Sequence, residues 1–122
     1  MLKGVLIAES LRIGAELDGV PLTLAKMSRI EAGTAADGQP RHWTLLEFEA
    51  AQSDAGPLAE ALAGCLAPTG GWYVNFNTSA EAFVVFAGQV FRYPRGDAAG
   101  RDKAKEYARS AGVPEAQLDW ED

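Results

Sequence analysis

The segment 82–93 constrains the fold more than any other part of the chain. Its two apolar runs are separated by Ala87 and Gly88, and glycine supplies the positive φ that a tight hairpin turn requires. With the turn centred there, the apolar side chains divide between two faces: Val84 and Phe91 on one, and Phe83, Val85 and Val90 on the other. Because both faces are apolar, we expect the hairpin to lie at the centre of a sheet or to be covered by a partner.

Alternation of side chains predicts further strands at 3–10, 42–50 and 72–77. The segment 22–32 is ambiguous. Pro21 is suited to the first turn of a helix, but the spacing of its apolar residues fits neither a helix nor a regular strand. We favour a strand with a bulge there. The Gly- and Pro-containing stretches 11–21 and 33–40 predict connecting loops, and we expect the second loop to be exposed.

Two helices are predicted between and after these strands. Ser53 or Asp54 can cap a helix whose apolar residues repeat at helical spacing and which ends near Pro68. Asp97 can cap a second helix over 98–111, and Pro114 can begin one further turn. The order β-β-β-α-β-β-β-α indicates an α+β fold, a mainly antiparallel sheet of five to six strands with two helices packed on one face. A chain of 122 residues predicts a single domain, 1–122.

Charge and composition exclude several classes of protein. The net charge is -6, which argues against a partner that is a nucleic acid or a membrane surface. The charge is uneven, with a net +3 over 92–109 between acidic segments on either side. The single cysteine, Cys65, excludes an internal disulfide, and the apolar run near the start is too short for a signal peptide. We therefore expect a cytoplasmic protein.

One strand face carries residues suited to a small polar or aromatic ligand. Tyr73, Asn75 and Asn77 alternate with apolar neighbours in the strand at 72–77. On an exposed sheet they are ordinary solvated residues, whereas in a groove an aromatic ring and two amides form a binding surface. This face is one of two candidate ligand sites.

The second candidate is an anion site at the start of the helix at 98–111. Arg92 and Arg95 lead into that helix, Arg101 lies one turn inside it, and free N–H groups at a helix N-terminus attract anions. Asp97 competes, because its carboxylate can occupy the same N–H groups. The segment 96–102 does not match the phosphate-loop pattern. Contact between 92–109 and a nucleic acid is a third, weaker hypothesis.

An enzyme is the alternative reading, with Glu47, Glu49 or His42 as acid or base. The two glutamates lie about 7 Å apart on one strand face, a separation at which paired carboxylates can act together. We favour a solvated strand face for them, because carboxylates with perturbed pKa values need burial that alternation alone cannot show. Cys65 lies on an apolar helical stripe, which is typical of a buried, inert thiol. We find no catalytic triad, metal-ligand spacing or cofactor motif, so we expect no cofactor and no metal.

Three segments resemble small uncharacterised bacterial proteins: GWYVNF at 71–76, FVVFAGQVFRYPRGD at 83–97 and VPEAQLDW at 113–120. The resemblance implies a compact bacterial domain of unknown function and carries over no catalytic residue. The leading hypothesis is therefore a non-enzymatic binding or interaction module. Its two-sided apolar hairpin predicts self-association, most simply as a twofold homodimer.

Overall fold

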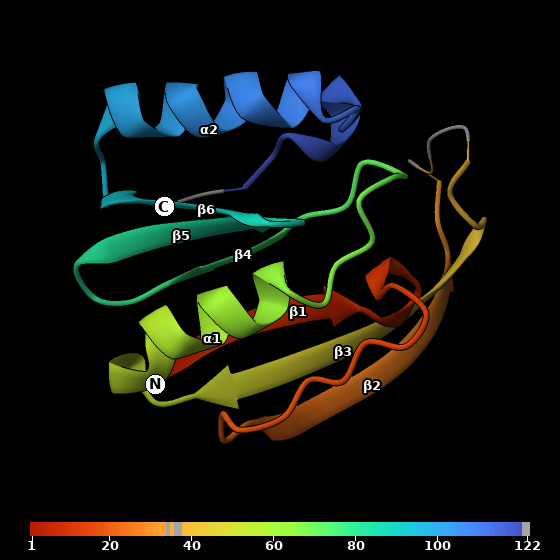
Figure 1. Cartoon of the computed structure of the whole chain (residues 1–122), viewed down its shortest axis with the longest axis horizontal. Coiled ribbons are helices and arrows are strands. Elements are labelled where there is room, and N and C mark those ends of the chain that lie inside the picture. Colours follow the sequence, from red (N-terminus) through yellow and green to blue (C-terminus); the bar gives the residue numbers. More distant parts are fainter. Residues whose placement is uncertain (34, 36–37, 121–122) are drawn as a thin grey trace.

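The computed structural model describes residues 1–33, 35 and 38–120. In this part of the chain, strands, α helices and short 3-10 helices follow one another in the expected β-β-β-α-β-β-β-α order (Figure 1). The strands are β1 (Leu2–Ile7), β2 (Thr23–Glu31), β3 (His42–Ala50), β4 (Val74–Asn77), β5 (Glu81–Phe86) and β6 (Gln89–Pro94). The helices are α1 (Ala55–Ala63) and α2 (Ala98–Ser110), with 3-10 turns η1 (Ala8–Ser10), η2 (Gln52–Asp54) and η3 (Glu115–Gln117).

One six-stranded antiparallel sheet has the order β2-β3-β1-β4-β5-β6, which confirms the α+β class. The second half, β4-β5-β6, is a simple meander. In the first half the chain leaves β1, forms the edge strand β2 and returns as β3 between them. The ambiguous segment is a strand, and its pairing with β3 shifts register between Leu24 and Lys26. The predicted bulge is therefore confirmed, and it explains why neither period fitted.

The hairpin at 82–93 has the predicted turn. Phe86 pairs with Gln89 across a two-residue loop, and Gly88 has φ 71°. The Gly88 N–H donates to the Ala63 carbonyl at 2.9 Å, which fixes the turn against the end of α1. Val84 pairs with Phe91 on one face, as predicted, and Val85 pairs with Val90 on the other.

The two helices cover opposite faces of the sheet, not the single face expected. Phe83 and Val85 of β5 share a core with α1, whereas Val84 and Phe86 share a core with α2. Figure 1 shows the β4-β6 meander between the two helices. The physical reason is that β5 is apolar on both faces, so one helical layer cannot remove both sets of side chains from water.

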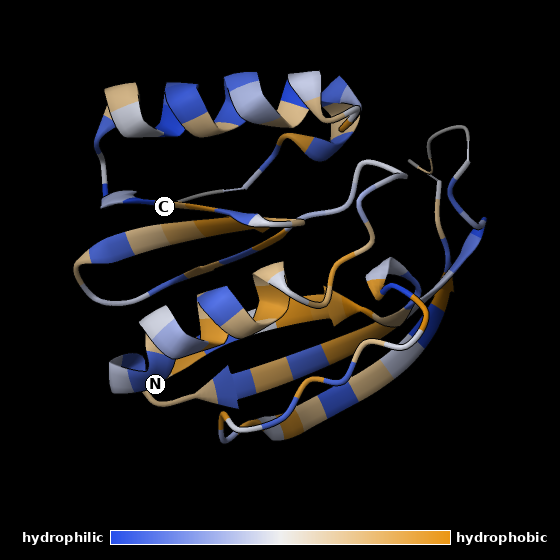
Figure 2. Ribbon diagram, in the orientation of Figure 1, coloured by the Kyte–Doolittle hydropathy of each residue, from blue (hydrophilic) through white to orange (hydrophobic). Residues whose placement is uncertain are grey.

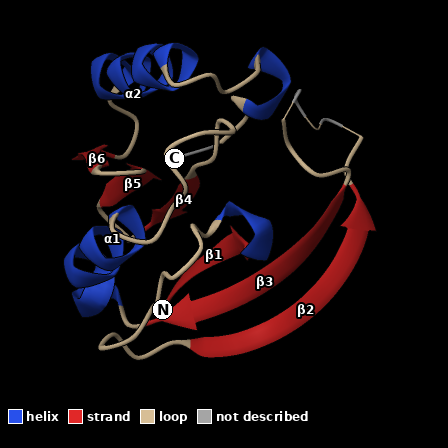
Figure 3. Ribbon diagram, turned by 45° about the vertical axis from the view of Figure 1, so that its right-hand side comes forward, coloured by secondary structure: helices blue, strands red, loops and turns tan. Residues whose placement is uncertain are grey.

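The first half of the sheet is covered unequally. On the α1 face, Leu2, Leu6 and Phe48 join the α1 core, and Leu17 and Val20 of the long β1–β2 connection pack against it. On the other face, α2 lies over β4-β6 only, and β1, β3 and β2 extend beyond it (Figure 3). Figure 2 shows that the C-terminal part of β1 is nonetheless strongly hydrophobic. This uncovered face carries the candidate site.

Local details of the elements depart from expectation in several places. The strand expected at 3–10 ends at Ile7 and continues as η1, the strand expected at 72–77 begins at Val74, and Asp54 precedes α1 without a side-chain cap hydrogen bond. Asp97 caps α2 as predicted, accepting from the Ala99 N–H at 3.2 Å. Helix α1 ends at Ala63, earlier than the expected end near Pro68. In the loop at 33–40, Gln39 is buried, contrary to the expectation of a fully exposed loop, because its amide donates to the Gly70 carbonyl. Residues 34, 36 and 37 of that loop lie outside the described part of the chain.

Glu9 in η1 ties the end of β1 to β3. Its carboxylate accepts from the Thr44 backbone N–H at 2.6 Å and from the Thr44 hydroxyl at 3.0 Å, and the Arg29 guanidinium lies 3.5 Å away. Partial burial raises the pKa of Glu9, but the hydrogen bonds from Thr44 and the charge of Arg29 outweigh burial, so the net shift is downward from 4.5. The folded state therefore favours the ionised carboxylate.

We predict that Glu9→Gln lowers the free energy of unfolding by about 1–2 kcal/mol at pH 7, because charge-assisted hydrogen bonds are lost. The pKa of Glu9 is lower in the folded than in the unfolded chain, so its contribution is complete above 4.5 and is lost as pH falls through the folded value. Urea unfolding between pH 7 and pH 3 measures both effects. The exposed Glu60→Gln of α1 is the control, and equal losses in the two variants would contradict the prediction.

Gly4 gives the second stability prediction. A Cβ at this position would lie 2.5 Å from Cζ of Phe48, whose ring is 4% exposed and has no room to move. We expect Gly4→Ala to destabilise the fold by about 1–3 kcal/mol through overpacking. Gly33→Ala meets no atom within 4 Å and should be nearly neutral. Thermal unfolding of the two variants side by side makes the comparison, and a neutral Gly4→Ala would show that the Phe48 ring yields.

Candidate functional site

A groove of about 260 Å³ lies between the uncovered face of the sheet and the C-terminal segment. Its floor is formed by four apolar side chains, Val5 and Ile7 of β1 and Trp43 and Leu45 of β3. One side is the chain at 71–75, leading into β4, and the other is η3 and the residue Asp119 that follows it. The groove therefore combines an apolar floor with polar groups from the end of the chain.

Strand alternation and strand order together place the floor residues side by side. Ile7 pairs directly with Leu45 across the β1–β3 ladder, and Val5 pairs with Glu47. Side chains that are directly opposite in an antiparallel pair share one face. Because β1 is also the neighbour of β4, the residues of 71–75 that point to this face complete the same surface.

Aromatic rings fix one end of the groove. The Trp43 and Trp72 rings meet edge to face, with centroids 5.6 Å apart and an interplanar angle of 63°. The Trp43 indole N–H donates to the Pro40 carbonyl at 2.9 Å, so its polar end is satisfied while its ring lines the groove. Both tryptophans are buried, and the arrangement holds this end of the floor rigid.

The C-terminal wall is held in place by polar contacts to three segments. The Tyr73 hydroxyl donates to the Gln117 carbonyl, and the Gln117 amide donates to the Gln39 side chain at 3.0 Å. The Trp120 indole N–H donates to the Tyr93 hydroxyl at 3.0 Å. Burial raises the pKa of Tyr73 well above its ordinary value of 10, and the charge and hydrogen bonding of Asp119 raise it further. Tyr73 therefore stays a neutral hydrogen-bond donor at physiological pH.

The first predicted ligand face is partly the groove. Tyr73 and Asn75 line it, as their alternation suggested, and both are half-buried. The Asn75 amide makes no hydrogen bond to any residue in the described part of the chain, so its donors and acceptor face the groove unpaired. Asn77 lies on the same strand but does not line the groove.

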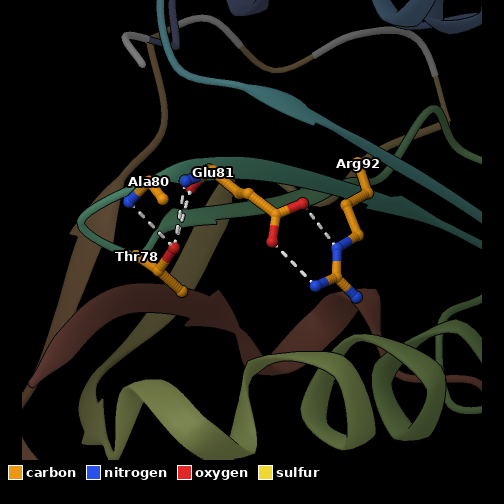
Figure 4. Close-up of polar contacts among 4 residues, drawn as sticks. All are labelled: Thr78, Ala80, Glu81 and Arg92. Carbon is orange, nitrogen blue, oxygen red and sulfur yellow. Dashed lines mark hydrogen bonds and ion pairs between the residues drawn. The ribbon is translucent and has the colours of Figure 1, made fainter.

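The predicted arginine site is not part of the groove. Arg92 forms two 2.7 Å hydrogen bonds to the Glu81 carboxylate (Figure 4). Its guanidinium also lies 5.0 Å from the centroid of the Phe83 ring. Arg95 donates to the Thr78 carbonyl at 3.3 Å, and the Asp97 carboxylate accepts from the Ala99 N–H at the start of α2, where Arg101 lies one turn in. Arg92 lines a separate hollow near the start of α1, but there its charge is neutralised by Glu81. These arginines therefore do not converge on one anion.

The predicted acid–base residues are also dispersed. Glu47 and Glu49 share the uncovered face, but each lies near a lysine, with Lys26 Nζ at 3.8 Å and Lys3 Nζ at 3.9 Å. His42 is exposed at the far end of β3, on the opposite face, about 17 Å along the strand from Glu47. These three side chains form no common site.

Cys65 is buried, as predicted, and its thiol donates to the Glu16 carbonyl at 3.3 Å. No base is recorded beside it among the residues that the structure describes, and its contacts are those of a packed side chain.

The sequence reasoning missed most of the groove, namely its floor and its C-terminal wall. Alternation alone placed Trp43 and Leu45 on one face, and it placed Val5 and Ile7 together. The missing information was that β1 lies between β3 and β4, which brings those faces into one surface. No local pattern indicated that Gln117 and Asp119 would fold back over it.

Comparison of the chain with protein-family models, with curated proteins and with solved structures finds no match. The resemblance of three segments to small bacterial proteins therefore stays a prediction. Within residues 1–33, 35 and 38–120, no group of three or more His, Cys, Asp or Glu side chains is placed to hold a metal ion. No helix in the same part of the chain has the length and hydropathy to cross a membrane.

Tyr73 can be tested spectroscopically. Because its pKa is raised by burial and by Asp119, the Tyr73 phenol should ionise at higher pH than free tyrosine. We expect the absorbance titration at 295 nm to show a component above pH 10, and Tyr73→Phe should remove that component. Tyr107→Phe, in α2, is the control and should leave it. A titration in which Tyr73→Phe removes only absorbance gained near pH 10 would contradict the proposed contacts.

Proposed function

We propose that this protein is a non-enzymatic binding module that takes a small ligand with an apolar body in the groove between β1, β3 and the C-terminal segment. The observation that carries the proposal is the composition of the groove, a rigid apolar floor facing unpaired or partly paired polar groups. Ligand sites in proteins commonly have this pattern, in which apolar area supplies affinity and a few polar groups fix orientation.

The size of the groove suits a compact ligand. Its volume of about 260 Å³ lies just below the usual range of ligand pockets, roughly 300 to 1,000 Å³. Val5 is 43% exposed, although it lies in the middle of β1, so burying it against a ligand would be favourable. The unpaired Asn75 amide can then donate to or accept from the polar end of the ligand.

Self-association remains a separate prediction. The two-sided hairpin that suggested it is covered within the chain by α1 and α2, so the hairpin no longer requires a partner. The edge strand β2 also exposes apolar side chains, since Leu24 is 55% and Met27 is 64% exposed. The bulge and the charged Lys26 and Arg29 of this strand disfavour pairing with another edge. Light scattering at micromolar concentration measures the oligomeric state.

The groove is tested by screening a library of small aromatic and aliphatic compounds by ¹H–¹⁵N NMR. We expect binders to shift the resonances of Val5, Ile7, the Trp43 indole and Asn75. Ala116→Trp should abolish these shifts, because Ala116 is exposed at the wall of the groove and a large ring there fills it. A ligand at 100 times its Kd should also add about 2.7 kcal/mol, or on the order of 10 °C in Tm.

Ala80→Trp is the matched control. Ala80 is equally exposed, but it lies in the β4–β5 turn outside the groove. Binding lost in Ala116→Trp and kept in Ala80→Trp supports the proposal. A library with no member that shifts the groove resonances, or binders that Ala116→Trp does not affect, would refute it.

A further inference from the structure

The polar side of the groove is richer in hydrogen-bond acceptors than in donors. The Tyr73 hydroxyl has a single hydrogen but two acceptors within reach, the Gln117 carbonyl and the Asp119 carboxylate. At most one of these contacts can be made at a time. The carboxylate of Asp119, with two oxygens, therefore keeps acceptor capacity that the residues described in the structure do not fill.

Positive charge is absent from the lining of the groove. Among the described residues that line it, none is a lysine or arginine, and Asp119 is the one ionised side chain. The segment 110–122 carries four acidic residues and no basic residue. An anionic ligand would thus meet an uncompensated carboxylate at close range, whereas a cation would meet its complement.

The aromatic rings of the groove favour the same sign of charge. Trp43, Trp72 and Tyr73 all line it, and the face of an aromatic ring attracts cations. The apolar floor from Val5 to Leu45 would contact the uncharged part of such a ligand. The surplus of acceptors, the absence of lysine and arginine among the described lining residues, the aromatic side chains and the apolar floor together define a compact site suited to a cation with an apolar body.

We propose that the ligand of the groove is a small organic amine, protonated at neutral pH, whose ammonium group binds at Asp119 and whose apolar body lies on the floor formed by β1 and β3. This inference rests on the proposed function and adds the chemical class of the ligand. The ammonium group supplies three donors, which matches the surplus of acceptors. The side-chain carbonyl oxygen of Asn75, on the opposite side of the groove from Asp119, is a further acceptor in its lining.

The test compares three probes that share a phenylethyl body: 2-phenylethylamine, its neutral isostere 2-phenylethanol and the slightly larger anion 3-phenylpropionate. Kd is measured for each by ¹H–¹⁵N NMR titration at low salt. We expect the amine to bind about tenfold more tightly than the alcohol, because it gains one charge-assisted hydrogen bond. The acid should bind most weakly of the three. Added salt should weaken binding of the amine more than binding of the alcohol.

Asp119→Asn keeps the shape of the side chain and removes its charge. We expect it to reduce the preference for the amine over the alcohol to below about threefold, with little change in the Kd of the alcohol. Glu106→Gln on α2 is the control, because it removes one negative charge at an exposed position outside the groove. It should leave the preference unchanged.

The outcomes separate this inference from the proposed function. Equal binding of amine and alcohol to the wild-type protein, or an amine preference that Asp119→Asn does not reduce, overturns the amine assignment while the groove stands as a binding site. Failure of the amine to bind while another library member shifts the groove resonances has the same meaning. A groove that no compound occupies refutes both proposals.

Discussion

The rest of the structure depends on burying both faces of β5. Its five consecutive residues from Ala82 to Phe86 are at most 2% exposed, and they point alternately to the two sides of the sheet. Removing both sets of side chains from water requires a layer on each side, and the chain supplies one helix for each. The stacked Phe76 and Phe83 rings on the α1 side, 5.1 Å apart, extend this packing to β4.

Because both helices are needed to cover β5, one face of the first half of the sheet has no helix over it. Helix α1 and the β1–β2 connection cover the same side of β1 and β3, and α2 is occupied by the meander. The chain that follows α2 partly compensates, since Trp120 packs edge to face on Tyr73 and donates to Tyr93. The groove is the space that remains where this segment ends and the open face continues.

Local patterns in the sequence were sufficient for the elements but not for their arrangement. Alternation identified the strands, the Gly88 turn and the division of the hairpin faces, and the irregular spacing at 22–32 identified the bulge. The helices were placed on one face because alternation says that a face is apolar but not which element covers it. Strand order could not be predicted for the same reason, because no local sequence pattern shows that β3 lies between β2 and β1.

The same limit applies to the candidate site: local patterns identified some of its residues but not the residues that surround them. Tyr73 and Asn75 were identified because their types and spacing are visible within one strand, whereas their partners come from β1, β3 and η3. The arginines at 92–101 form a local excess of charge in the sequence, yet in the fold Arg92 is neutralised by Glu81, which lies on the neighbouring strand of the hairpin, diagonal to it.

Asp119 is the opposite of Arg92, because nothing in the local sequence singles it out and yet it lines the groove. It lies in an acidic tail without any motif, and its position beside Tyr73 arises from packing of the C-terminal segment on the sheet. In a small domain, therefore, the sequence shows which residues are charged, but only the fold shows which of these charges are paired within the chain and which can contact a ligand.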